Sequence, residues 1–179
     1  MKKLILISLS FIVLFLISCK PSADKARTKV TDMEKQCTSD PQFYNNRVKT
    51  EELLKAYTDF AGKYEDDTAT PHFLFNAANI AMNTSKPDLA IDLFKKNSDQ
   101  GKENKYAATS LFLLGFVYEN NKKDLGKAKE AYNEFLSKYP DHVLAPSAKS
   151  SLDNLGKSPE QLIMEFEAKN KADSLAKKK

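Results

Sequence analysis

The sequence contains few of the residues that build metal sites, disulfide frameworks and catalytic centres. Its 179 residues include no tryptophan, five glycines, two cysteines and two histidines. Because His72 and His142 are the only histidines, we expect no metal site of three or four strong ligands. A glycine-rich phosphate loop, a Gly-x-Ser-x-Gly turn and a His-Glu-x-x-His pair are also missing. We therefore expect no cofactor and no enzymatic activity.

Strand patterns and a strong charge bias are missing as well. Alternating Val, Ile and Thr residues are almost absent, whereas long stretches are rich in Ala, Leu, Lys and Glu, which predicts an all-α chain. The formal net charge is +4, and it falls to +2 without residues 1 to 18, which contain Lys2 and Lys3. This excess is too small for a nucleic-acid-binding face, so we expect no nucleic-acid partner.

The chain opens with a positively charged start and an apolar run. Lys2 and Lys3 precede residues 4 to 17, in which only Ser8 and Ser10 are polar. This order is typical of a secretory signal. The run of about 14 residues is shorter than the roughly 20 that a permanent membrane helix needs. We therefore predict a signal peptide and no mature membrane span.

The end of this run resembles the lipobox of bacterial lipoproteins. It reads Leu16-Ile17-Ser18-Cys19. The resemblance implies that residues 1 to 18 are removed and that Cys19 is lipidated, which would anchor the chain to a membrane. The alternative is an ordinary signal peptide with a chance cysteine. Because Lys20 rather than aspartate follows the cysteine, and no acidic cluster comes next, lipoprotein sorting implies the outer membrane of a Gram-negative cell, with the domain facing the periplasm.

The segment after Cys19 is polar. We predict a lipidated cysteine and flexible tether over residues 19 to 47, because a helix from Asp24 to Gln36 would have too thin an apolar stripe to dock firmly. With Cys19 lipidated, Cys37 has no intramolecular partner. Cys37 is then either an incidental thiol or a link between two chains.

An apolar-aromatic pair recurs along the rest of the chain. Its copies are Leu53 and Tyr57, Ala90 and Phe94, and Ala128 and Tyr132, at spacings of 37 and 38 residues. Residues 56 to 64 are also echoed 75 residues later by residues 131 to 139. A period of this length indicates stacked helical hairpins, because each hairpin needs a neighbour to bury its apolar face. Such stacks favour binding over catalysis.

Helix-boundary signals agree with this period. Thr50, followed by two glutamates, predicts a helix that runs to about Tyr64. Proline in the first turn predicts further helix starts at residues 70–71, 87, 145–146 and 158–159. Pro140 and Gly156 are expected to end helices.

Two of these units resemble tetratricopeptide repeats. The signature positions are filled by Leu74, Ala77, Ala78, Ala81, Ala90 and Phe94, and then by Leu111, Leu114, Gly115, Tyr118, Ala128, Tyr132, Phe135 and Pro140. Gly115 is the small residue expected to let paired helices cross tightly. The distance from Gly115 to Ala128 is one residue longer than usual, which predicts an insertion in the turn at residues 120 to 125.

The resemblance implies a fold and a binding face. We expect an all-α, tetratricopeptide-repeat-like stack of antiparallel helical hairpins, in a right-handed α-α superhelix, over residues 48 to 166. Residues 167 to 179 would form a basic C-terminal helix end, interpreted as solvated or, alternatively, as a contact for anionic lipid or cell-wall polymer. The charged C-terminal residues would cap the array.

In this family the first helix of each pair lines a concave groove. The partner-binding residues would then be Phe75, Asn79, Met82, Asn83, Phe112, Phe116, Glu119 and Asn120. The phenylalanines have a second interpretation, as core residues packed against the neighbouring hairpin. Asn79 matches one element of the carboxylate clamp of some tetratricopeptide domains, but Phe75 and Leu113 depart from it, so recognition of a free C-terminus is not expected.

Two functional hypotheses follow. The first is a membrane-anchored adaptor of the bacterial envelope that binds a partner protein or peptide through the groove. Similar repeat lipoproteins serve in outer-membrane protein insertion or in coordinating cell-wall synthesis with division, as the resemblance implies. The alternative is a structural assembly subunit that self-associates through its terminal hairpins.

Overall fold

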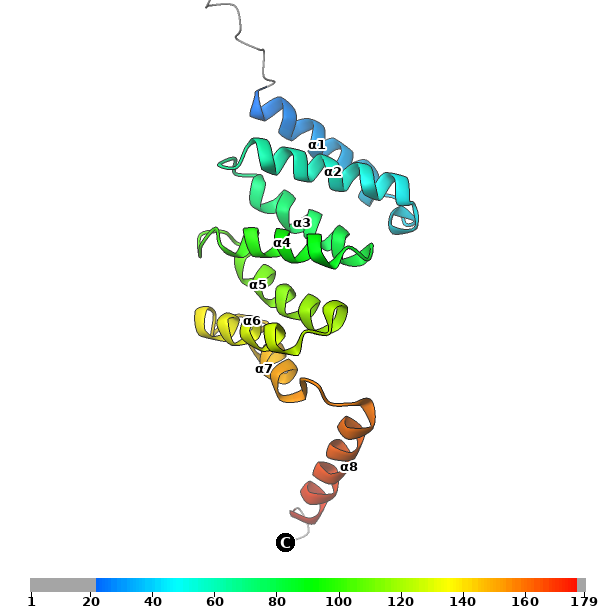
Figure 1. The fold of residues 1–179 in the computed structure, drawn as a ribbon, viewed down its shortest axis with the longest axis vertical. Helices are drawn as coiled ribbons and strands as arrows, with labels where there is room; N and C mark the ends of the chain where they lie inside the picture. Colours follow the sequence, from blue (N-terminus) through cyan, green and yellow to red (C-terminus); the bar gives the residue numbers. More distant parts are fainter. Residues whose placement is uncertain (1–21, 177–179) are drawn as a thin grey trace, which may run out of the picture.

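The computed structural model describes residues 22 to 176, which are helical and contain no strand. The main helices are α1 (Ala23–Thr38), α2 (Arg47–Lys63), α3 (Thr70–Asn83), α4 (Pro87–Ser98), α5 (Ala107–Val117), α6 (Leu125–Lys138), α7 (Ala145–Asn154) and α8 (Pro159–Ala176). Helices α1 to α7 form a column in which each packs on the next, and α8 extends from its lower end (Figure 1). The prediction of an all-α, tetratricopeptide-repeat-like stack is confirmed.

The same turn recurs where one hairpin leads to the next. Asp67, Asn104 and His142 each accept a hydrogen bond from a backbone N–H two residues later. The distances are 2.9 Å to Ala69, 2.9 Å to Tyr106 and 3.2 Å to Leu144. The residue after each turn is buried, namely Thr70, Ala107 and Ala145. These turns lie 37 and 38 residues apart, the spacing of the sequence repeat.

Small residues receive aromatic rings between paired helices. A Cβ atom on Gly115 of α5 would lie 2.7 Å from Cε1 and 2.8 Å from Cδ1 of Tyr132 on α6. Tyr132 is fully buried, and its hydroxyl donates a hydrogen bond of 2.8 Å to Glu119. Only glycine leaves room for the ring at this crossing, as the sequence predicted for Gly115.

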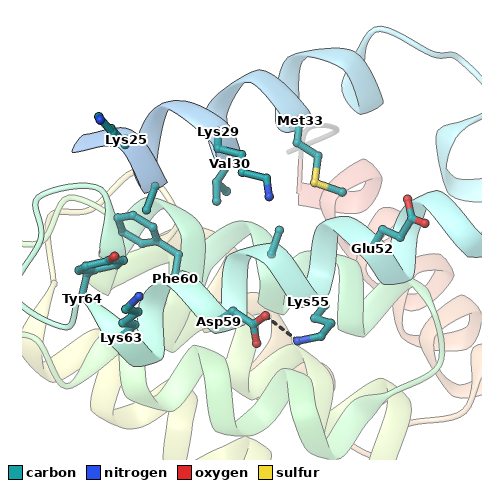
Figure 2. Close-up of a pocket in the computed structure, with 12 residues that line it drawn as sticks. Lys25, Lys29, Val30, Met33, Glu52, Lys55, Asp59, Phe60, Lys63 and Tyr64 are labelled. Atoms are coloured by element: carbon teal, nitrogen blue, oxygen red, sulfur yellow. Dashed lines mark hydrogen bonds and ion pairs between the residues drawn. The ribbon is translucent and has the colours of Figure 1, made fainter. Parts of the chain in front are cut away.

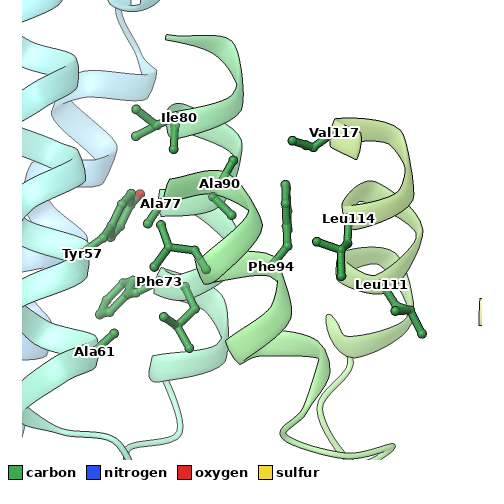
Figure 3. Packing of buried hydrophobic residues seen from close by; sticks show 14 of the residues in the cluster. Tyr57, Ala61, Phe73, Ala77, Ile80, Ala90, Phe94, Leu111, Leu114 and Val117 are labelled. Carbon is green, nitrogen blue, oxygen red and sulfur yellow. The ribbon is translucent and has the colours of Figure 1, made fainter. Parts of the chain in front are cut away.

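The same principle fills the core between α2 and α5. Ala77, Ala78 and Ala81 of α3 are completely buried. The Phe73 ring stacks on Tyr57 with centroids 5.3 Å apart. Figure 3 shows this layer continuing through Phe94 of α4 toward α5. One apolar core therefore runs through the whole stack.

The expected insertion takes the form of a widened helical turn that starts before the predicted turn at residues 120 to 125. Tyr118–Lys122 (η3) form a π-helix at the end of α5, where the i to i+5 pattern takes up an extra residue. Lys123 then adopts a left-handed conformation with φ of 57°. The backbone N–H of Asp124 donates to the carbonyl of Tyr118 at 2.9 Å, and α6 starts at the next residue.

The tether predicted for residues 19 to 47 is wrong where the structure describes it. Residues 23 to 38 form α1, which packs on α2 as the first helix of an additional hairpin. Its apolar stripe is thin but sufficient, because Val30 and Cys37 are each only 7% exposed. The bidentate pair of Arg27 with Asp67 also holds α1, with N–O distances of 3.0 and 2.6 Å.

The start of α2 also differs from its prediction. The helix begins at Arg47, because the Asn46 side chain accepts a hydrogen bond from the Lys49 backbone at 3.1 Å and caps the N-terminus. Thr50 lies inside the helix, where its buried hydroxyl donates to the carbonyl of Arg47 at 2.9 Å. Asparagine at position 46 is as good a cap as threonine and comes earlier.

The C-terminal end departs from the expected cap. Gly156, with φ of 79°, ends α7 as predicted. Helix α8 then leaves the column instead of covering it (Figure 1). Within residues 22 to 176, no helix is both long and apolar enough to cross a membrane.

Gly115→Ala tests the tight crossing of α5 and α6. Overpacking against the buried Tyr132 ring costs about 1–3 kcal/mol, whereas alanine improves an open helix by up to about 1 kcal/mol. We expect the variant to lose about 1 kcal/mol of unfolding free energy in urea denaturation. Gly62→Ala is the matched control, because a Cβ atom at Gly62 meets nothing within 4 Å. Equal stabilisation by both changes would contradict the close contact.

Asp67→Asn tests the docking of α1. The hydrogen bonds from Arg27, which outweigh burial, hold the pKa of Asp67 below its usual value. The stabilisation by the Arg27–Asp67 pair is therefore complete above about pH 4, the ordinary aspartate pKa. It is lost as the pH falls through the lowered pKa that Asp67 has in the folded state.

We expect wild-type protein to be more stable than Asp67→Asn at neutral pH, with a difference that narrows in acid, as measured by urea denaturation across pH. Exposed Asp66 supplies the control, since Asp66→Asn should change stability by less than about 0.5 kcal/mol. A difference in unfolding free energy between wild type and Asp67→Asn that stays constant down to low pH would argue against this ion pair.

Candidate functional site

The residues predicted to bind a partner lie on two helices of the stack and on the π-helical turn that follows the second. We call them the α3–α5 surface. They are Phe75, Asn79, Met82 and Asn83 of α3, Phe112 and Phe116 of α5, and Glu119 and Asn120 of η3. Tyr106, which precedes α5, joins the two helices, because its ring stacks on Phe75 at 5.1 Å and its hydroxyl shares a hydrogen bond of 2.9 Å with His72.

The three phenylalanines of this surface differ in exposure. Phe75 is half-buried and also contacts Phe94, with ring centroids 6.2 Å apart. Phe112 is half-buried against Phe135 at 5.8 Å. Phe116 is 40% exposed. Phe75 and Phe112 are therefore partly core residues. Of the three phenylalanines, Phe116 has the largest exposed fraction of its surface available to a partner.

The amides of the surface are oriented by their own helices. Asn79 donates to the carbonyl of Phe75 at 2.8 Å, and Asn120 donates to the carbonyl of Phe116 at 3.1 Å. Asn83 and Asn120 are exposed, while Met82 is half-buried against the core. The exposed amides supply hydrogen-bonding groups of the kind that bind a peptide backbone.

Glu119 has a structural role. Its carboxylate accepts the hydrogen bond from Tyr132, and burial and this carboxylate raise the pKa of Tyr132. The hydroxyl therefore remains a donor, and Glu119 links η3 to α6. Sequence reasoning placed Glu119 in the binding face without detecting this contact, because the π-turn that brings it to Tyr132 was not foreseen.

Helix α1 adds residues that sequence reasoning did not assign to the surface. Glu34 is half-buried and lies 2.9 Å from Nε2 of His72. Asn76 of α3 donates to the same carboxylate at 2.7 Å. The helical spacing of Val30 and Cys37 in the sequence indicates a packed helix face. This indication was missed because the segment was predicted to be a tether.

A pocket of about 270 Å³ lies where α1 meets α3. Its walls include Glu34, Thr38, Asn76 and Asn79, and Tyr57 lines it as well. Burial, reinforced by the Glu34 charge, raises the pKa of Tyr57, so its hydroxyl stays protonated. The pocket combines one carboxylate with hydroxyl and amide groups, which suits hydrogen bonding to a backbone or a polar side chain.

The structure describes only one of the two cysteines. Cys19 lies outside the described residues. Cys37 is buried, and burial raises the pKa of its thiol. A buried, protonated thiol favours the interpretation of Cys37 as incidental over a link between chains. Residues 22 to 176 also contain no group of three or more His, Cys, Asp and Glu side chains arranged for a metal ion.

Comparison with known proteins finds a family match for one unit of the stack. Residues 109 to 142, which contain most of α5 together with η3 and α6, match the family model described as tetratricopeptide repeat. No curated protein matches the chain. Tetratricopeptide repeats are generally non-catalytic scaffolds for protein-protein interaction, and this repeat carries half of the α3–α5 surface.

Proposed function

We propose that this chain is a lipid-anchored adaptor of the bacterial cell envelope that binds a partner protein or peptide through the α3–α5 surface. The observation that carries the proposal is the mixed character of that surface. On this surface Phe116, Asn83 and Asn120 are exposed, and the rings of Phe75 and Phe112 are half-buried. Aromatic anchors bordered by amides are typical of peptide-binding grooves.

The stack supports this role because it holds the surface rigidly. Phe75 and Phe112 pack on Phe94 and Phe135, and Tyr106 contacts both Phe75 and His72. A preorganised surface loses little conformational entropy on binding. The adjoining pocket at Glu34 and Asn76 would accept a polar group of the same partner.

The proposed location in the envelope is based on the N-terminal sequence. The apolar run and the lipobox-like Leu16-Ile17-Ser18-Cys19 support lipidation at Cys19. Lys20 supports the outer membrane, with the domain in the periplasm. Because α1 begins at Ala23, the repeats would lie close to the membrane surface.

Position-dependent crosslinking tests the binding surface. A photoreactive residue at Phe116 or Asn83 should yield one discrete crosslinked partner in intact cells. The same residue at exposed Lys129 of α6 is the control and should not. Once that partner is identified, the double change Asn83→Ala and Phe116→Ala should weaken its binding about tenfold, measured by calorimetry. Crosslinks that are absent, or equal at Lys129, would reject the surface.

Cys19→Ser tests the anchor. Wild-type protein should incorporate an alkyne-labelled fatty acid and sediment with membranes, whereas Cys19→Ser should do neither, because the acyl chains supply the membrane affinity. Cys37→Ser provides the comparison and should keep both properties. Labelling that survives Cys19→Ser would rule out lipidation at this residue.

A further inference from the structure

An open groove lies at the N-terminal end of the stack, between α1 and α2 (Figure 2). It has a volume of about 760 Å³. Its floor is apolar. The half-buried residues of the floor are Ala26 and Met33 of α1, Ala56 of α2 and Tyr64, which follows α2, while Val30 and Phe60 also line it but are buried. None of the described helices covers this floor. We call this open groove the α1–α2 groove.

The rim of the α1–α2 groove is basic. Lys25 and Lys29 stand on α1, and Lys55 and Lys63 stand on α2, so both walls carry positive charge (Figure 2). The acidic lining residues are Glu52 and Asp59, and Asp59 pairs with Lys55 at 2.5 Å. An apolar floor between lysines favours an apolar ligand that is bordered by negative charge.

Helix α8 has the complementary pattern. Its residues Leu162, Ile163 and Phe166 are 36%, 57% and 66% exposed. At about 100° per residue they occupy one side of the helix. Glu160 and Glu167 border this side on one edge. On the other edge, Glu165 pairs with Lys157 at 2.7 Å. The apolar stripe of α8 therefore carries negative charge along one edge, which complements the lysines beside the floor of the groove.

The two surfaces belong to opposite ends of the molecule. In Figure 1, α1 lies at the top of the column and α8 extends from the bottom. A chain cannot place its own α8 in its own groove while the stack stays intact. We propose that the α1–α2 groove binds α8 of a second copy, so that the chains associate end to end.

This contact joins two different patches, so it is heterologous. Each bound copy still presents one groove and one α8, and association extends as a row or closes into a ring. The α3–α5 surface takes no part in the contact. Self-association would therefore present several binding surfaces side by side, and the proposal stands independently of the partner of those surfaces.

Paired charge reversals test the contact in the full chain, purified in detergent micelles and examined by sedimentation velocity at increasing concentration. Wild-type protein should associate as its concentration rises. Lys29→Glu with Lys63→Glu makes the groove acidic, and Glu160→Lys with Glu167→Lys makes α8 basic. Each double variant alone should stay monomeric, because its two ends repel each other.

An equimolar mixture of the two double variants should recover association. The acidic groove of the first variant then meets the basic α8 of the second, and the basic groove of the second meets the acidic α8 of the first. Lys129→Glu with Lys149→Glu is the matched control, since it makes the same change in net charge as the groove variant at exposed positions on α6 and α7. This control should associate like wild type. Phe166→Ala should weaken association about tenfold, through loss of a buried aromatic anchor.

Three results would overturn the proposal: a wild-type protein that stays monomeric, reversals that leave association unchanged, or a control that loses it equally. Phosphatidylglycerol added to the micelles tests whether the α1–α2 groove binds anionic lipid rather than α8. A monomeric wild type that binds this lipid, and loses binding with Lys29→Glu and Lys63→Glu, would assign the groove to anionic lipid instead. Far-ultraviolet circular dichroism of each variant confirms that the helices are retained.

Discussion

The stack depends on close approach between helices whose apolar faces cannot be buried alone. At the crossing of α5 and α6, the missing side chain of Gly115 makes room for the ring of Tyr132. At α3, buried alanines allow Phe73 and Phe94 to fill the space between neighbouring layers. Because every layer is completed by the next, the fold has one continuous core and two unmatched ends.

Polar contacts link successive hairpins of this packing. Glu51 pairs with Lys86, Asp88 with Lys122, and His72 with Tyr106, at separations of 35, 34 and 34 residues. Exposed ion pairs of this kind contribute little to stability individually. They show instead that successive hairpins lie side by side. The same stacking brings α3 and α5 together and so creates the proposed binding surface.

The sequence allowed accurate prediction wherever a residue had a distinctive physical role. Gly115, Gly156 and the extra residue before Ala128 each imposed a backbone feature that the structure contains. Prediction failed for α1, because two well-buried residues and an ion pair to a distant turn stabilise that helix, and the partner in the pair, Asp67, lies 40 residues away. It also failed for α8, since charge pattern alone does not reveal whether a helix covers its neighbour. The candidate surface was located from the repeat register, but the role of Glu34 required the position of α1.

Nuclear Overhauser effects between the ring protons of Tyr132 and the α-protons of Gly115 measure the central contact directly. Strong cross-peaks are expected, because the ring lies so close to Gly115 that a Cβ atom there would be 2.7 Å from Cε1 of Tyr132. An assigned Tyr132 ring that shows cross-peaks to other core residues and none to Gly115 would contradict the stacking on which the rest depends.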